Sequence, residues 1–161
     1  MWRGNTDSAV EEVIVAETIA SILKAKGQET WSVAPDATVY DSITLMAEKG
    51  VGAVLVISEG KLVGIISERD YARKVALENR SSRDTRVREI MTPDPVTARP
   101  ENTVEECMTI MTQYRIRHLP VLDGENLVGI VSIGDLVKTM IADQAHTIDQ
   151  LQTYIVGKYP G

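Results

Sequence analysis

Two stretches of the chain share one pattern of apolar and polar positions. In the first, Val39, Ile43 and Met46 recur at helical spacing, and the apolar runs AVLVI (53–57) and LVGII (62–66) follow. Residues three and four apart lie on one face of a helix, whereas short apolar runs bounded by turn residues are typical of strands. The pattern therefore predicts a helix and two strands, with the strands joined by a tight turn at SEGK.

The same order of elements returns 65 residues later. Residues 31–70 and 96–135 align without a gap and are identical at 12 of 40 positions, where unrelated sequences would share roughly 2 or 3. The second helical face is Val104, Met108 and Met111, and the second pair of strands is LPVLD (119–123) and LVGIV (127–131). The chain therefore contains a duplicated unit, whose lead-in strands are predicted at WSVAP (31–35) and PVTARP (95–100).

Each unit starts its helices with the same signal, a Ser or Thr followed three residues later by an acidic residue, which is the pattern of a capping box. The four pairs are Thr38 with Asp41, Ser67 with Asp70, Thr103 with Glu106, and Ser132 with Asp135. The last helices are predicted at about 68–79 and from about 133 towards 156. Residues 8–26 also carry helical spacing and stop at Gly27, a typical C-cap.

These elements predict an α/β (α+β) fold of two β-α-β-β-α units packed sheet to sheet with pseudo-twofold symmetry, because one unit alone cannot cover both its sheet and its helices. The first unit with its N-terminal helix is expected at 8–79 and the second, with an extended C-terminal helix, at 91–156. Residues 80–90 form a basic linker, for which a solvated connection is favoured over a nucleic-acid contact.

Composition narrows the functional classes. The net charge of −6 argues against nucleic-acid binding, which needs a basic face. No apolar run reaches the length of about 18 residues that spans a bilayer, so we expect no membrane insertion and a cytoplasmic location. Cys107 is the single cysteine and there are two histidines, so neither an internal disulfide nor a metal site is predicted.

The segments GIISERD (64–70) and GIVSIGD (129–135) carry the candidate chemistry. One interpretation is local, since Ser67 and Asp70 alone would cap a helix. The other is a nucleotide site: the start of a helix attracts phosphate, a serine hydroxyl adds a hydrogen bond, and a carboxylate one turn in can accept bonds from the two hydroxyls of a ribose. The pattern alone leaves both interpretations open.

The duplication, the two P-x-x-TV segments, the strand RHLPV (117–121) and the two G-x-x-S-x-x-D segments together resemble a tandem pair of cystathionine β-synthase (CBS) domains, a Bateman module, over residues 10–140. The resemblance implies a regulatory module without catalytic residues or a catalytic cofactor, which binds adenine nucleotides between its units. AMP is the expected ligand, with NAD, ADP and ATP as alternatives.

The resemblance also implies two sites, each built from both units. The first would combine Ser67, Arg69, Asp70, Thr92, Thr97, Ile116, Arg117 and His118. The second would combine Gly27, Ser32, Val51, Gly52, Ala53, Ser132 and Asp135. In the repeat Arg69 aligns with Gly134, and Arg117 and His118 align with Gly52 and Ala53. Tighter binding of phosphate is therefore expected at the site that contains Asp70.

Three functional classes remain from the sequence. The first is a stand-alone sensor that signals to an unidentified protein partner through a conformational or assembly change. Residues 136–156 carry a long apolar stripe that either covers the protein's own core or pairs with a second copy, and the resemblance to CBS pairs, which commonly dimerise through helices, implies a homodimer. The second is a structural adaptor with vestigial sites. The third, a nucleotide-processing enzyme, has little support, because the chain lacks a P-loop and a carboxylate cluster for a metal.

Overall fold

The computed structural model describes residues 17–158 of the chain, so residues 8–16 of the predicted N-terminal helix and first unit lie outside the described part. The fold is α+β, as predicted. In chain order the elements are α2 (Ile19–Lys26), β1 (Ser32–Val33), α3 (Val39–Lys49), β2 (Ala53–Ser58), β3 (Lys61–Ser67), α4 (Glu68–Tyr71), the π-helix η1 (Ala72–Ala76), α5 (Val87–Ile90), β4 (Thr92–Pro93), α6 (Val104–Tyr114), β5 (His118–Asp123), β6 (Asn126–Ser132) and α7 (Ile133–Lys158).

The duplication is visible residue by residue. The bounds of α6, β5 and β6 are those of α3, β2 and β3 shifted by 65 residues. Both hairpins are antiparallel, with Ala53 opposite Ser67 in one and His118 opposite Ser132 in the other. Both also carry a register shift at the same place, after Val56 and after Val121.

The two sheets differ at their edges. The first has the strand order β1-β2-β3-β4, whereas the second contains β5 and β6 alone. The strand predicted at 95–100 is wrong as a strand, because only Ala98 bridges to the second sheet: its N–H donates to Pro120 at 2.9 Å and its carbonyl accepts from Leu122 at 2.9 Å. Prolines at both ends of the segment lack the N–H groups that a longer ladder requires.

Two separate clusters of buried side chains form the cores. The first lies within residues 31–91, and α5, at the end of the predicted linker, contributes Val87 and Ile90 to it. The second takes Ile19, Ile22 and Leu23 from α2 and joins them to side chains of α6, β5, β6 and α7. The helix that adjoins the first unit in the sequence therefore packs in the second core.

The glycine of each repeated segment makes room for this packing. A Cβ added to Gly129 would stand 2.7 Å from Cδ2 of Leu23 in α2, and a Cβ added to Gly64 would stand 2.6 Å from Sδ of Met91, next to β4. Real Cβ atoms do not come so close to their neighbours. In both repeats the glycine therefore admits a neighbouring part of the chain rather than a ligand.

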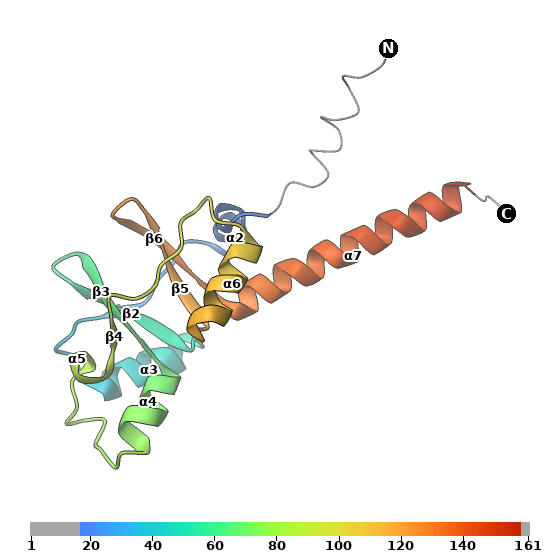
Figure 1. The fold of residues 1–161 in the computed structure, drawn as a ribbon. Helices are drawn as coiled ribbons and strands as arrows, with labels where there is room; N and C mark the ends of the chain where they lie inside the picture. Colours follow the sequence, from blue (N-terminus) through green and yellow to red (C-terminus); the bar gives the residue numbers. More distant parts are fainter. Residues whose placement is uncertain (1–16, 159–161) are drawn as a thin grey trace.

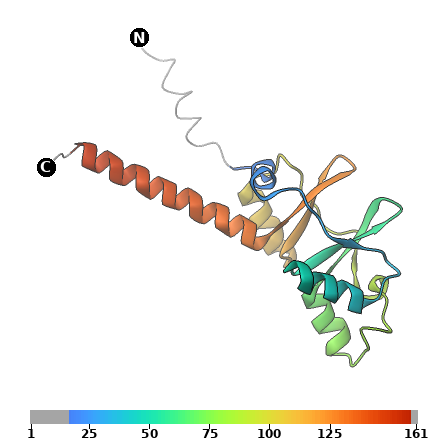
Figure 2. The ribbon, with the colours of Figure 1, turned by 180° about the vertical axis from the view of Figure 1, so that it is seen from behind.

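The two hairpins lie side by side with their turns pointing the same way, and the helices cover their outer sides (Figure 1). Helices α3 and α4 flank the first hairpin and α2 and α6 flank the second, so the sheets lie between the helices. Helix α7 begins in the second core, where Leu136 is fully buried, and then extends away from both units (Figure 2). Among the side chains of α7 that the structure describes, four large apolar ones are exposed: Val137, Met140, Ile141 and Ile148.

Candidate functional site

A cavity of about 390 Å³ lies between the two units. Residues of β3, α4 and β4 line one side, and the start of β5 and the residues just before it line the other. The lining residues are Gly52, Ile65, Ser67, Glu68, Arg69, Asp70, Arg73, Thr92, Pro95, Val96, Arg115, Ile116, Arg117 and His118. Seven of the eight residues expected at the first site are among them, and Thr97 is not.

Ser67 and Asp70 are held in a complete capping box at the start of α4. The Ser67 hydroxyl accepts from the Asp70 N–H at 3.2 Å, and Oδ2 of Asp70 accepts from the N–H of Ser67 at 3.0 Å and from its hydroxyl at 3.1 Å. Oδ1 pairs with Lys74 at 3.2 Å, and Lys74 also donates to the carbonyl of Ile90 at 2.9 Å. The capping role and the cavity position therefore occur together, and neither interpretation of the segment excludes the other.

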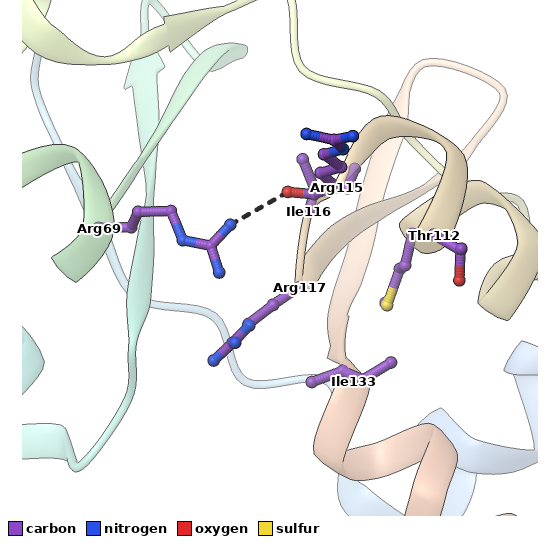
Figure 3. A pocket seen from close by; sticks show the side chains of 7 residues that line it. Arg69, Thr112, Arg115, Ile116, Arg117 and Ile133 are labelled. Carbon is purple, nitrogen blue, oxygen red and sulfur yellow. Dashed lines mark hydrogen bonds between the residues drawn. The ribbon is translucent and has the colours of Figure 1, made fainter. Parts of the chain in front are cut away.

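Positive charge gathers along the same cavity. Four arginines line it, against the two carboxylates of Glu68 and Asp70, although the chain as a whole carries a net charge of −6. Arg69 reaches from the first unit to the second, where its guanidinium donates to the carbonyl of Arg115 at 3.2 Å (Figure 3). A cluster of guanidinium groups is suited to phosphate, because each can donate two parallel hydrogen bonds.

Two of these arginines, Arg73 and Arg115, were not expected at the site. Arg115 caps α6 with a left-handed backbone at φ 55°, and its counterpart in the first repeat is Gly50, at φ 65°. Since left-handed geometry is unfavourable for a residue with a side chain, the replacement of a glycine by arginine in the repeat was a signal that could have identified this position. Arg73 follows α4 within the π-helix, and no local pattern in the sequence marks it.

His118 stands at the junction of the two expected sites. A Cβ added to Gly52 would lie 3.4 Å from its ring, so the absence of a side chain at Gly52 lets the imidazole pack against the first unit. Burial lowers the pKa of His118 below its ordinary value, and the charges of Lys26, Arg117 and Arg69 act in the same direction while Asp135 opposes them. The ring is therefore neutral at neutral pH and can act as a hydrogen-bond partner rather than as a charge.

The second repeated segment has the same local geometry but a different neighbour. Oδ2 of Asp135 accepts from the N–H of Ser132 at 2.8 Å, and the Ser132 hydroxyl accepts from the N–H of Asp135 at 3.2 Å. Lys26, at the end of α2, pairs with the same Oδ2 at 2.5 Å and donates to the carbonyl of Ile130 at 2.9 Å. A cation of the chain itself thus occupies the carboxylate that the second site would offer to a ribose.

This ion pair changes the titration of Asp135. Burial raises the pKa of its carboxyl group, but hydrogen bonds from Lys26 and Ser132, together with the charge of Lys26, bring the pKa below the ordinary value of an aspartate. The carboxylate is therefore charged and committed to Lys26 at neutral pH.

The remaining residues of the expected second site come from the first unit. Gly27 ends α2 with φ at 101°, directly after Lys26, and Ser32 begins β1. Val51 and Gly52 precede β2, which begins at Ala53. Of this set, Gly52 lines the cavity described above, which is the cavity that Asp70 faces.

The part of the chain that the structure describes contains neither a metal site nor a membrane-spanning helix. Among residues 17–158 no group of three or more His, Cys, Asp or Glu side chains could hold a metal ion. In the same residues no helix is both long and apolar enough to cross a membrane. Cys107 is buried in the second core, where burial raises the pKa of its thiol to about 11.

Comparison with known proteins identifies the duplicated unit. The family model of the CBS domain matches residues 29–77 and 87–142. The chain is 40% identical over 152 residues to the mitochondrial CBS domain-containing protein CBSX3 of Arabidopsis thaliana, with 88% of this chain and 73% of that protein covered.

Solved structures show the same arrangement. A putative signal-transduction protein with CBS domains from Burkholderia ambifaria is 55% identical and superposes with a TM-score of 0.77 over 79% of this chain and 96% of the other. The CBS domain pair of protein MJ0100, in complex with 5′-methylthioadenosine and S-adenosyl-L-methionine, is 25% identical and has a TM-score of 0.71 over 80% of this chain and 98% of that one. With two matched segments, a shared fold and a relative of this similarity, the chain belongs to the CBS domain family as a tandem pair.

Proposed function

We propose that the chain is a regulatory sensor that binds an adenine nucleotide in the cavity between its CBS units, with AMP as the expected ligand. The observation that carries the proposal is the meeting of the Ser67 and Asp70 pair with Arg69 and Arg117 in one cavity between the two units. Asp70 would accept hydrogen bonds from the ribose hydroxyls, and the arginines would hold the phosphate.

Charge and similarity both support an adenosine ligand. The cavity carries four arginines against two carboxylates, which favours an anion. The solved complex of a CBS pair with 5′-methylthioadenosine and S-adenosyl-L-methionine, two ligands that contain adenosine, supports the nucleoside part. His118, neutral and packed against Gly52, would offer a ring nitrogen to the ligand without repelling or attracting its charge.

Signalling would then follow from the position of the cavity. A ligand that contacts both units can shift their relative orientation by the difference between its affinities for the two arrangements. Arg69 already crosses between the units to Arg115, so an anion that binds Arg69 also acts on this contact. The module itself would be non-catalytic, and its output would pass to a protein partner or to a change of assembly.

We further propose that α7 mediates a homodimer. Helix α7 is 26 residues long and leaves the core, so most of it lacks the tertiary packing that supplies most helix stability in proteins. Val137, Met140, Ile141 and Ile148 are exposed on it, and they fall within the apolar stripe predicted from the sequence. Pairing of two such helices would cover these side chains and stabilise both.

A cytoplasmic location stays a prediction.

The test is the identity of the ligand that the protein retains. We expect freshly purified protein to release an adenine nucleotide on denaturation, identified by mass spectrometry, and nucleotide-free protein to bind AMP reversibly in calorimetry without converting it. Absence of binding by AMP, ADP, ATP and NAD would exclude the proposal and would favour a structural adaptor. Conversion of the nucleotide during the titration would instead favour an enzyme.

A further inference from the structure

A second cavity, of about 240 Å³, adjoins the first. Both are lined by Arg69, Arg115, Ile116 and Arg117, so these four residues form the border between them. The other residues of the second cavity are Met111, Thr112 and Ile133. Figure 3 shows how it is assembled: Arg69 approaches from the first unit, Arg115 to Arg117 come from the segment leading into β5, and Ile133 lies at the start of α7.

The two cavities differ in chemistry. The first holds the Ser67 and Asp70 pair, which suits a ribose, and a concentration of charge. The second has no carboxylate among its lining residues, and beyond the arginines its wall consists of methionine, isoleucine and threonine side chains. A ligand that filled both would therefore carry negative charge in its middle, at the arginines, and an uncharged group with apolar surface at its far end.

The hydrogen bond between Arg69 and Arg115 lies at this border. It uses one N–H of the Arg69 guanidinium and one backbone carbonyl. Since a guanidinium has five N–H donors, Arg69 retains donors for phosphate oxygens. Arg117 is exposed and lines both cavities, so two guanidinium groups from different units can face the same stretch of ligand. Two linked phosphates present enough oxygens to accept from both in bidentate fashion.

We propose that the two cavities form one extended site for an adenine dinucleotide, in which a pyrophosphate bridge lies at the arginine border and the second base occupies the cavity of Met111, Thr112 and Ile133. This inference rests on the proposed function, since the adenosine end would use the first cavity. AMP would leave the second cavity empty, and the terminal phosphates of ATP would reach the border but place no apolar group beyond it.

The test uses NADH, whose dihydronicotinamide ring is uncharged, as the dinucleotide probe and AMP as the short one, and it compares two threonine variants of α6. Thr112 and Thr109 are both exposed and each donates its hydroxyl to the carbonyl four residues before it, but only Thr112 lines the second cavity. We expect Thr112→Phe to weaken NADH binding by about tenfold, as loss of one end of the ligand's contacts should, and to leave AMP binding unchanged. Thr109→Phe should change neither.

A second measurement needs no variant. In the wild-type protein, nuclear Overhauser effects are expected between the dihydronicotinamide protons of NADH and the methyl groups of Ile133 or Met111. Contacts confined to the adenosine half, or an NADH affinity that Thr112→Phe leaves unchanged, would overturn the extended site while the proposed binding of AMP stood. Failure of the wild-type protein to bind NADH would overturn the extended site, and failure to bind any of AMP, ADP, ATP and NAD would overturn the proposed function as well.

Discussion

The two repeated aspartates should contribute unequally to nucleotide binding, and the substitutions Asp70→Asn and Asp135→Asn test this. Each keeps the size of the side chain and one oxygen acceptor for the neighbouring serine N–H, which lies 3.0 Å from the carboxylate in the first repeat and 2.8 Å in the second. The two variants are therefore matched in local geometry. They differ in the groups that the carboxylate contacts in the wild-type protein.

The magnitude follows from the hydrogen bonds to the ribose. A bond to a charged acceptor contributes about 1.5–3 kcal/mol and a neutral one about 0.5–1.5 kcal/mol, so two ribose hydroxyls lose together about 2 kcal/mol when the carboxylate of Asp70 becomes an amide. That loss corresponds to an affinity about 30-fold weaker. Both carboxylates pair with a lysine, but Lys26 stands 2.5 Å from Asp135 whereas Lys74 stands 3.2 Å from Asp70. The closer lysine leaves Asp135 less able to accept from a ribose, so the change expected there for the tightest-binding nucleotide is less than about threefold.

Calorimetry with AMP on nucleotide-free protein measures both constants, and urea unfolding checks that each variant keeps its fold. Because an asparagine oxygen still accepts the capping bond, both variants should lose less than about 1 kcal/mol of stability. Equal losses of AMP affinity, or a larger loss for Asp135→Asn, would refute the assignment of the stronger site to Asp70 and the role given to Lys26.

Three further predictions concern packing, pH and assembly. Gly129→Ala should lower the free energy of unfolding by about 1–3 kcal/mol, because the new methyl overlaps α2. The control is Gly134→Ala, whose methyl would stand 3.6 Å from its nearest neighbour and should not lower it. Equal urea midpoints for the two variants would contradict the close contact. Since the folded pKa of Asp135 is lowered, its stabilising effect should be present at neutral pH and lost as the pH falls through that pKa. In Lys26→Met the urea midpoint should therefore fall less on acidification than in the wild-type protein. An unchanged dependence of the midpoint on pH would argue against the ion pair. Ile141→Glu, on the exposed stripe of α7, should convert a dimer into a monomer in light scattering, and a persistent dimer would place the interface elsewhere.

Local pattern was sufficient to predict the interior of each unit. The helical faces of α3 and α6 and the two hairpins were predicted because apolar spacing and turn residues act within a few residues of one another. Ser67 and Asp70 were predicted as a capping pair for the same reason, and the structure contains the complete capping box.

The features that the sequence did not reveal depend on contacts between distant segments. The pairing of β4 with β3 and the packing of α2 in the second core join parts of the chain through space, and no short-range signal specifies such partners. The pairing of Lys26 with Asp135 was not predicted, because this contact spans 109 residues of the chain. Arg115 was missed although the repeat itself marked it, since it replaces Gly50 at a left-handed position.

The placement of α2 has a consequence for how the chain folds. The second core closes only when the segment before β1 meets the segment after β4, where the N–H of Val104 donates to Glu17 at 3.0 Å and the N–H of Ile19 donates to Asn102 at 2.9 Å. The first unit is thus an insertion within the second. Once folded, it holds the ends of the inserted stretch close together and reduces the loop-closure entropy that the second unit must overcome. The boundaries of the sequence repeat therefore do not coincide with the boundaries of the folded units.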